Sequence, residues 1–271
     1  MKAISALPDI KNVAHAFSQA AKNYDDVAGL QRLAADKLLL KSKNAHFGDV
    51  LDIGSGTGYV SSQLASIDNV DSVTGLDIAE GMLERAKVLH NSNKLSWQLG
   101  DAQHIMAHLP DCEGHYDLVI SSLAIQWCQN LDAVFEGVAN CLKDDGVFYC
   151  ATLGPDTLYQ LKWAWSQVDD YQHVNDFVGA EQVRASLENY FSDIEIEQEP
   201  IQLEFPTVQQ LINGLKKLGA SNRNTSAAQG LTSAGKLRKM IDAYETLRGE
   251  DGLLPVTYDV IYITAKPRVS E

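Results

Sequence analysis

Cysteine is scarce in this chain of 271 residues, and its four cysteines are far apart: Cys112, Cys128, Cys141 and Cys150. No two of them form a Cys-x-x-Cys pair, and no histidine stands at the spacing of a zinc finger. The sequence therefore predicts neither a disulfide framework nor a metal site. We expect reduced thiols in or near the core.

Long hydrophobic runs are also missing. No stretch approaches the roughly 18 uninterrupted apolar residues of a membrane span, and the N-terminal residues lack the apolar core of a secretion signal. The sequence therefore predicts a cytoplasmic protein with no membrane partner.

Basic residues are outnumbered, with 22 Lys and Arg against 36 Asp and Glu, which gives a net charge of −14. This balance argues against a nucleic-acid partner. Residues 207–248 are the exception, because they carry two acids, Asp242 and Glu245, and these basic residues: Lys216, Lys217, Arg223, Lys236, Arg238, Lys239 and Arg248. The segment is either a docking face for an acidic partner or a solvated helix face.

Length and composition indicate one large domain with a hydrophobic content of 45%. We divide the single domain 1–271 into N-terminal helices (1–45), a cofactor-binding core (46–155) and a substrate-side half (156–271) with a helical lid at about 207–250. Helical periodicity over residues 10–41, interrupted at Gly29, predicts two N-terminal helices.

The chain is organised around residues 49–59, where a short apolar strand ends in Asp52 and continues into Gly54, Ser55, Gly56 and Gly58. Glycines at alternate positions remove the Cβ atoms that would keep a nucleotide-sized ligand away from the backbone. A plain strand-to-helix turn is the simpler alternative.

Later strands repeat this pattern of an apolar run that ends in an acid. Residues 72–78 end at Asp77 and residues 95–102 reach Asp101, and strands over 116–122 and 147–152 follow, with helices between them. Asp77 stands where Rossmann-like folds place a carboxylate on ribose hydroxyls. The alternation predicts a parallel, doubly wound α/β sheet whose carboxyl edge carries the acids.

The second half has a different pattern. Helices are expected over 157–168, 180–189, 207–218 and 234–248, and residues 194–205 and 256–265 alternate like strands. The two strands predict an antiparallel edge hairpin with the basic helices inserted as a lid.

The glycine turn, Asp77, the Gly100-Asp101-Ala102 turn and the strand over 116–121 together resemble class I S-adenosylmethionine-dependent methyltransferases. The Gly-x-Gly-x-Gly spacing differs from the Gly-x-Gly-x-x-Gly of NAD enzymes. The resemblance implies a Rossmann-like, seven-stranded methyltransferase sheet.

A narrower resemblance extends over almost the whole chain. Six dispersed motifs are similar to the malonyl-acyl-carrier-protein O-methyltransferases of biotin synthesis: Phe17-x-x-Ala20-Ala21-x-x-Tyr24, Ser122-Leu123-Ala124-x-Gln126-Trp127, residues 152–158, His173-Val174-Asn175, residues 218–224 and Thr257-Tyr258. This resemblance implies methyl transfer from S-adenosylmethionine to the free carboxylate of a malonyl group on acyl carrier protein or coenzyme A. The product is the malonyl methyl ester that primes pimeloyl and biotin synthesis.

The resemblance also implies residue roles. Tyr24, Gln126 and Trp127 would position the reactants without a general base. The cofactor would contact Asp52, Gly54, Ser55, Gly56, Gly58, Asp77, Ile78, Met82, Asp101, Ala102 and Ser121. The acceptor and its carrier would contact His173, Asn175, Lys216, Lys217, Arg223, Lys236, Arg238 and Lys239.

Simpler roles stay open for several of these residues. Trp127 could belong to the core, Gln126 could cap the next helix and His173 could be structural. Asp176 stands where many members of the family have arginine, so the cation that meets the malonyl carboxylate is unassigned, and Arg223 is one alternative.

Three other functions fit parts of the sequence. The main alternative is a methyltransferase acting on another small carboxylic acid or a quinone-like hydroxyl. An inactive cofactor-binding interaction domain and a dinucleotide-dependent oxidoreductase are the others, and the glycine spacing disfavours the last.

Overall fold

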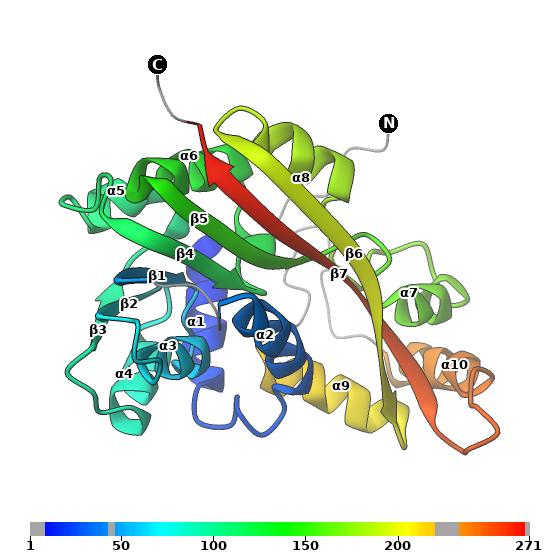
Figure 1. The fold of residues 1–271 in the computed structure, drawn as a ribbon. Helices are drawn as coiled ribbons and strands as arrows, with labels where there is room; N and C mark the ends of the chain where they lie inside the picture. Colours follow the sequence, from blue (N-terminus) through cyan, green and yellow to red (C-terminus); the bar gives the residue numbers. More distant parts are fainter. Residues whose placement is uncertain (1–8, 43–46, 220–232, 269–271) are drawn as a thin grey trace.

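The computed structural model describes residues 9–42, 47–219 and 233–268 of the chain. Its centre is one seven-stranded sheet in the order β3-β2-β1-β4-β5-β7-β6 (Figure 1). The strands are β1 (Asp49–Ile53), β2 (Ser72–Asp77), β3 (Leu95–Leu99), β4 (Tyr116–Ser122), β5 (Leu142–Leu153), β6 (Phe191–Phe205) and β7 (Leu254–Pro267).

The first five strands are parallel, whereas β7 runs antiparallel to both of its neighbours, β5 and β6. The predicted doubly wound sheet with an antiparallel edge hairpin is therefore confirmed. Strands β2 and β3 lie on one side of β1, and the chain then crosses over to place β4 on the other side of β1. The strand order reverses at this point, and α/β sheets bind ligands at such a reversal.

Helices cover both faces of the sheet. The main ones are α1 (Ile10–Ala20), α2 (Gly29–Ser42), α3 (Tyr59–Ala65), α4 (Glu80–Leu89), α5 (Ile105–His108), α6 (Leu131–Cys141), α7 (Tyr159–Ser166), α8 (Ala180–Leu187), α9 (Val208–Lys217) and α10 (Ala234–Glu245). Buried side chains of α2, α3, α7, α9 and α10 form one core cluster, and those of α5, α6 and α8 form the other.

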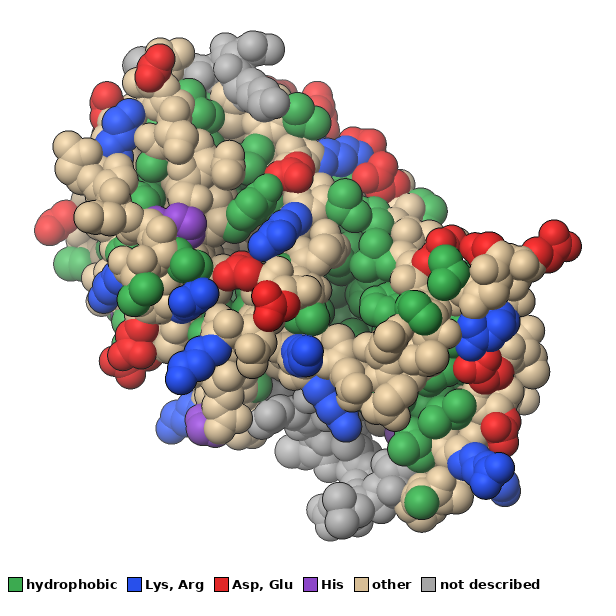
Figure 2. All heavy atoms as spheres, turned by 90° about the horizontal axis from the view of Figure 1, so that it is seen from below, with side chains coloured by type: hydrophobic (Ala, Val, Ile, Leu, Met, Phe, Trp, Pro, Cys, Tyr) green, Lys and Arg blue, Asp and Glu red, His purple; other side chains and the backbone are tan. Residues whose placement is uncertain are grey.

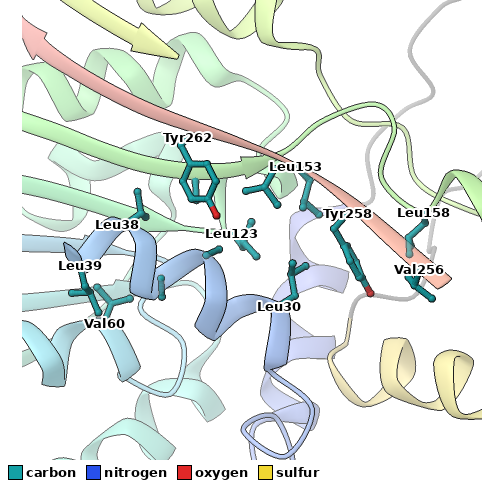
Figure 3. Packing of buried hydrophobic residues seen from close by; sticks show 14 of the residues in the cluster. Leu30, Leu38, Leu39, Val60, Leu123, Leu153, Leu158, Val256, Tyr258 and Tyr262 are labelled. Atoms are coloured by element: carbon teal, nitrogen blue, oxygen red, sulfur yellow. The ribbon is translucent and has the colours of Figure 1, made fainter. Parts of the chain in front are cut away.

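The core beneath α2 brings the N-terminal helices against the C-terminal strand. Figure 3 shows side chains of α2 pointing toward buried residues of β5 and β7, among them Leu30, Leu38, Leu153, Tyr258 and Tyr262. This packing explains why an N-terminal helix and the last strand can border one site.

Glycines allow two further helix contacts. A Cβ on Gly81 of α4 would lie 2.7 Å from the Ser18 carbonyl oxygen of α1, so only glycine lets these helices approach this closely. Gly219, with φ +74°, follows α9 and would place a Cβ 3.2 Å from the backbone of Ala16. Helix α1 is thereby held between α4 and the end of α9.

Most element boundaries agree with the sequence prediction to within a few residues, and three local differences have physical causes. Helix α1 ends at Ala20 and α2 begins at Gly29, so Tyr24 lies in the turn between the two predicted N-terminal helices. Strand β5 begins at Leu142, before the predicted start at residue 147, because its first residue pairs with Tyr116 across an irregular register. Strand β6 begins at Phe191, earlier than predicted, since that residue pairs with Pro267.

All four cysteines are free and buried, as predicted. In the described parts of the chain, no helix is long and apolar enough to cross a membrane.

Candidate active site

The glycine turn after β1 forms the base of the site. Gly54, Gly56 and Gly58 all have positive φ, at +70°, +55° and +87°. A Cβ on Gly54 would lie 2.1 Å from the Ala124 side chain, whereas a Cβ on Gly56 would meet nothing within 4 Å. Gly54 is therefore required by close packing, and Gly56 leaves open space next to the backbone.

Asp77 lies at the end of β2 and is held by that turn. Its two carboxylate oxygens each accept one backbone N–H, from Gly56 at 2.8 Å and from Ala79 at 2.7 Å. Burial raises the pKa of Asp77, and these N–H donors act against the rise. The side chain is fixed with acceptor capacity left at the wall of a pocket.

This inner pocket opens at the carboxyl edge of the sheet. Nine residues with a predicted role line it: Tyr24, Gly54, Gly56, Asp77, Ile78, Met82, Asp101, Ala102 and Trp127. The predicted convergence of strand ends is therefore observed as one cavity.

Asp101 has a second task beside lining the inner pocket. It caps the short 3-10 helix Ala102–His104 (η1), where its Oδ1 accepts the Gln103 backbone N–H at 2.9 Å. Gln103 in turn accepts N–H groups from Gln129 and Asn130. The carboxylate of Asp101 is thus oriented by its neighbours while one side faces the pocket.

A polar pocket adjoins the inner pocket on the α2 side. It is lined by Asp25, Arg32 and Asp52 and by three buried oxygens without a hydrogen bond among the described residues: Gln31 Oε1, Ser55 Oγ and Ser122 Oγ. Buried oxygens without a partner are costly, and they indicate a site for a polar ligand.

Asp52 lies at the back of the polar pocket. Its Oδ2 accepts a 2.6 Å hydrogen bond from the Ser61 hydroxyl. Burial raises the pKa of Asp52 to about 7. The charge of Asp77 adds to this rise in pKa, and the hydrogen bond from Ser61 acts against it. Asp52 is therefore poised between its neutral and charged forms near neutral pH.

A third, apolar pocket lies beyond Tyr24. Its walls come from α1, α2, α9, β7 and the segment that follows β4. They include Phe17, Leu158, Phe177, Leu215, Leu218 and Tyr258. Leu215 and Leu218 show that the inserted helix α9 covers this pocket.

Tyr24 lines all three pockets. The neighbouring Asp25 accepts a 2.9 Å hydrogen bond from the Thr57 hydroxyl, which ties this turn to the glycine turn. Burial, together with the charges of Asp77 and Asp25, raises the pKa of Tyr24, so its hydroxyl stays protonated. This hydroxyl has no hydrogen-bond partner among the described residues and is free to donate.

Trp127 is placed beside Tyr24 through an aromatic cluster. Phe17 packs edge-on against both rings, at 5.7 Å from Trp127 and 6.4 Å from Tyr24 between ring centroids. Trp127 lines the inner and apolar pockets. Its indole N–H also has no partner within the described part of the chain.

The side chain of Gln126, unlike those of Tyr24 and Trp127, does not line the inner pocket. Its amide donates a 2.6 Å hydrogen bond to the Leu123 carbonyl, and it lines the apolar pocket but not the inner one. One of its two N–H donors therefore stabilises the short 3-10 helix Ile125–Trp127 (η2).

Two predicted cofactor residues lie outside these pockets. Gly58 packs where a Cβ would meet Trp97 at 2.6 Å, and Ser121 donates its hydroxyl to the Ile53 carbonyl at 2.9 Å. Ser122 lines the inner and polar pockets instead of its neighbour. Sequence reasoning did not assign five further pocket residues: Phe17, Asp25, Gln31, Arg32 and Ser122. Phe17 and Ser122 belong to motifs quoted above, whereas the other three had no signal.

His173 and Lys236 meet at one carboxylate rather than in a pocket. Asp169 accepts hydrogen bonds from His173 at 2.7 Å and from Lys236 at 2.8 Å. The His173 ring stacks on the Trp165 ring, with 3.7 Å between the ring centroids. Against the effect of desolvation, these two hydrogen bonds lower the pKa of Asp169 to about 2. The cluster links α10 to the segment that follows α7.

The remaining predicted acceptor residues are dispersed. Asn175 is buried, and its Oδ1 has no partner among the described residues. Lys216, Lys217, Arg238 and Lys239 are exposed on α9 and α10, whereas Arg223 lies outside the described residues. Figure 2 shows Lys and Arg side chains around a hollow with hydrophobic side chains on the underside of the molecule.

Several solved structures share this fold. A family model described as methyltransferase domain matches residues 51–150. The YcgJ protein of Bacillus subtilis superposes with a TM-score of 0.62 at 16% identity, over 87% of this chain and 99% of that one. The DhpI–SAH complex gives a TM-score of 0.54 at 19% identity, over 69% of this chain and 90% of that one. Fold and site together define a class I, Rossmann-like methyltransferase.

Sequence relatives narrow the class. The malonyl-[acyl-carrier protein] O-methyltransferase of Gallionella capsiferriformans is 35% identical over 94% of this chain and 89% of its own length. The enzyme of that name from Hahella chejuensis is 34% identical over 93% of this chain and 88% of its length. The chain belongs to the malonyl-[acyl-carrier protein] O-methyltransferase family, as its dispersed motifs predicted, and members of this family are S-adenosylmethionine-dependent carboxyl O-methyltransferases.

A bifunctional relative has the same region within a longer chain. The biotin biosynthesis bifunctional protein BioHC of Cellvibrio japonicus is 41% identical over 94% of this chain. The present chain spans about half of the length of that relative, 50%.

Proposed function

We propose that this chain transfers a methyl group from S-adenosylmethionine to the free carboxylate of a malonyl thioester on acyl carrier protein, which gives the methyl ester that enters biotin synthesis. The observation that carries the proposal is that an acid-lined, a polar and an apolar pocket meet at Tyr24. A methyl donor with a nucleoside and an amino-acid part needs the first two, and an acyl acceptor needs the third.

The inner pocket fits the nucleoside part of the donor. Asp77 would accept the two ribose hydroxyls, since its oxygens keep acceptor capacity beyond their backbone N–H donors. Asp101 and the backbone of Ala102 would receive the adenine amine. The open space beside Gly56 lets the ligand approach the backbone.

The polar pocket fits the amino-acid tail. Its carboxylates, Asp25 and Asp52, suit an ammonium, and Arg32 suits a carboxylate. The unpartnered oxygens of Ser55 and Ser122 gain the donors that they lack when an ammonium lies there.

S-adenosylmethionine, held by the inner and polar pockets, would supply an activated methyl group, and its transfer to a carboxylate oxygen would leave a neutral thioether without moving a proton. A carboxylate is already ionised at neutral pH. The chain therefore needs to supply alignment and a dry site, and alignment alone can lower a barrier by roughly 7–11 kcal/mol in the best cases.

Tyr24 and Trp127 provide this alignment. The Tyr24 hydroxyl and the Trp127 indole N–H are the free donors at the junction, and each would hold one acceptor carboxylate oxygen. Phe17 keeps the two rings in place and excludes water with its own apolar face. Burial keeps the tyrosine hydroxyl a donor, because its pKa is raised.

The test compares three acceptors under identical conditions: malonyl-carrier protein, acetyl-carrier protein and free malonate. S-adenosylhomocysteine formation should be rapid with the first, absent with the second, which lacks a free carboxylate, and slow with the third, which lacks the thioester arm. Equal or faster turnover of free small acids, or of a quinone-like hydroxyl, would reject the malonyl-carrier assignment. Malonyl-coenzyme A separates the two thioester carriers in the same assay.

A further inference from the structure

An outer groove continues from the apolar pocket toward the surface between α2, α9 and the end of β6. Its floor is apolar, with Leu203, Phe205, Leu211 and Tyr258, and three amide side chains, Gln31, Gln210 and Asn213, stand along it. The hollow with hydrophobic side chains in Figure 2 lies on this side of the molecule.

The outer groove and the apolar pocket share walls. Leu30, Gln31, Leu215, Leu218 and Tyr258 line both. A ligand that reaches Tyr24 from solvent can therefore follow one path along α9, with the groove first and the junction of the three pockets last.

Lys217 and Asp26 are exposed and line the outer groove together with the amide side chains of Gln31, Gln210 and Asn213. Gln31 also lines the apolar pocket. Gln31 Oε1 is buried without a partner among the described residues, so it can accept an amide N–H from a ligand in the path.

A second branch leaves the apolar pocket on the other side, past Gln126, Leu153 and Phe177. Its charged residue is Asp176, and the described residues that line it include no Lys or Arg. Lys162 lies 3.9 Å from Asp176 but does not line this branch. The outer groove has Lys217 among its lining residues beside the acid Asp26, so the outer groove suits a phosphate better.

We propose that the outer groove holds the pantetheine arm of the acceptor, with its amides beside Gln31 and Asn213 and its phosphate near Lys217. The arm combines apolar segments, two amides and a phosphate, and the outer groove offers an apolar floor, amide side chains and one lysine, Lys217. This assignment rests on the proposed function, because it presupposes an acceptor carried as a thioester on such an arm.

Gly214 allows a sharp test. It lies on α9 in the wall of the groove, and a Cβ there would meet only the Phe205 ring, at 3.9 Å. Alanine therefore fits at this position, whereas a phenylalanine side chain would fill the groove. Gly214→Ala is the matched control for Gly214→Phe, because both changes also remove a helical glycine.

The experiment measures methylation of malonyl-carrier protein and of the short malonyl thioester of N-acetylcysteamine, which ends at the first amide and lacks the rest of the arm. Gly214→Phe should lower kcat/KM for malonyl-carrier protein by roughly tenfold or more. Methylation of the short thioester and affinity for S-adenosylhomocysteine should stay unchanged, and Gly214→Ala should behave like the unmodified chain.

Two outcomes would overturn the assignment of the outer groove to the pantetheine arm but leave the proposed function intact. Full activity of Gly214→Phe on malonyl-carrier protein would place the arm elsewhere, and an equal loss on both acceptors would show a general disturbance of the site rather than a blocked groove. Failure of the unmodified chain to methylate either thioester would instead reject the proposed function.

Discussion

Tyr24 illustrates how a single residue can join three binding surfaces. It lies in the turn after α1, is linked to the glycine turn through the hydrogen bond of Asp25 with Thr57, and lines the inner, polar and apolar pockets. A hydroxyl at this junction is close to every ligand part that the proposed reaction brings together.

Replacing Tyr24 with phenylalanine should therefore slow methyl transfer without weakening cofactor binding. The ring and its packing on Phe17 remain, and only the donor is lost. A hydrogen bond to a charged group contributes about 1.5–3 kcal/mol, so kcat/KM for the acceptor should fall by roughly 10- to 100-fold. Steady-state methylation and calorimetry with S-adenosylhomocysteine measure the two effects.

The exposed Tyr159→Phe is the matched control for this change. Unchanged turnover of Tyr24→Phe, or a loss of cofactor affinity in the same proportion as the loss of rate, would contradict the assigned role.

Asp52 gives a pH-dependent prediction. Burial raises its folded-state pKa to about 7, whereas an unfolded aspartate titrates near about 3.9. The folded chain therefore keeps a proton that the unfolded chain loses, so this contribution to stability is full below about pH 4 and is lost as the pH rises toward 7.

The Asp52→Asn variant should remove this slope. We compare the free energy of unfolding of the variant with that of the unmodified chain at each pH. The difference, variant minus unmodified, should be more positive at pH 8 than at pH 5 by roughly 2–4 kcal/mol, because asparagine stays neutral. Urea denaturation at the two pH values tests it, with the exposed Asp68→Asn as the control. Parallel pH profiles for Asp52→Asn and the unmodified chain would show that Asp52 is not titrating in this range.

Sequence reasoning found the acids of the site because each stands at the end of an apolar strand, and parallel strands end at one edge. It could not foresee that Gln31 and Ser122 are the residues left with unpartnered oxygens, because the packing of α2 against β1 and β4 determines which side chain faces the cavity. It assigned Ser121 for the same reason, one residue away from the side chain that faces the pocket.

Helix α9 is the element that connects the cofactor half to the proposed carrier. Its buried face closes the apolar pocket with Leu215, and Lys216 and Lys217 are exposed in its last turn. Cations in the last turn also complement the helix dipole, so their positions alone do not identify a docking face. An acidic carrier would be repelled by a chain with net charge −14 unless such a face guided it.

Reversal of both charges, Lys216→Glu with Lys217→Glu, should lower kcat/KM for malonyl-carrier protein by roughly tenfold at low salt. The effect should diminish as salt is raised, since screening weakens steering. Kinetics at two ionic strengths measure it, and Lys87→Glu, an exposed lysine on α4, is the control.

Activity on the short malonyl thioester shows whether the double variant is intact. A salt-independent loss on both acceptors would mean damage to the helix, and no loss on the carrier protein would move the docking face to Arg238 and Lys239 on α10.

The inserted helices were predictable from their periodicity and from the alternating strands on either side of them. Their long-range polar contacts were not. Lys236 is paired with Asp169, which lies after α7, and this pair depends on which loop comes to lie beside α10. The pair of Arg248 with Glu245 joins residues three apart, so the sequence spacing allows it.

At the scale of the whole molecule, the sheet order brings three pockets together at one residue, Tyr24. The acids and glycines stand at the ends of β1 and β2 and after β3, and Ser122 ends β4. Strand β7 and the helices inserted before it enclose the apolar side. The fold was predictable from alternation and strand-end acids because these patterns are local. The division of the site into three pockets was not, because it arises from contacts between the N-terminal helices and the last strand.

Mass spectrometry of malonyl-carrier protein, after incubation with this chain and S-adenosylmethionine, tests the central claim most directly. The account predicts a gain of one CH₂ unit, located by fragmentation on the malonyl carboxylate, because a methyl group takes the place of the acid's proton. An unchanged mass, or a methyl group located on the carrier polypeptide, would contradict it.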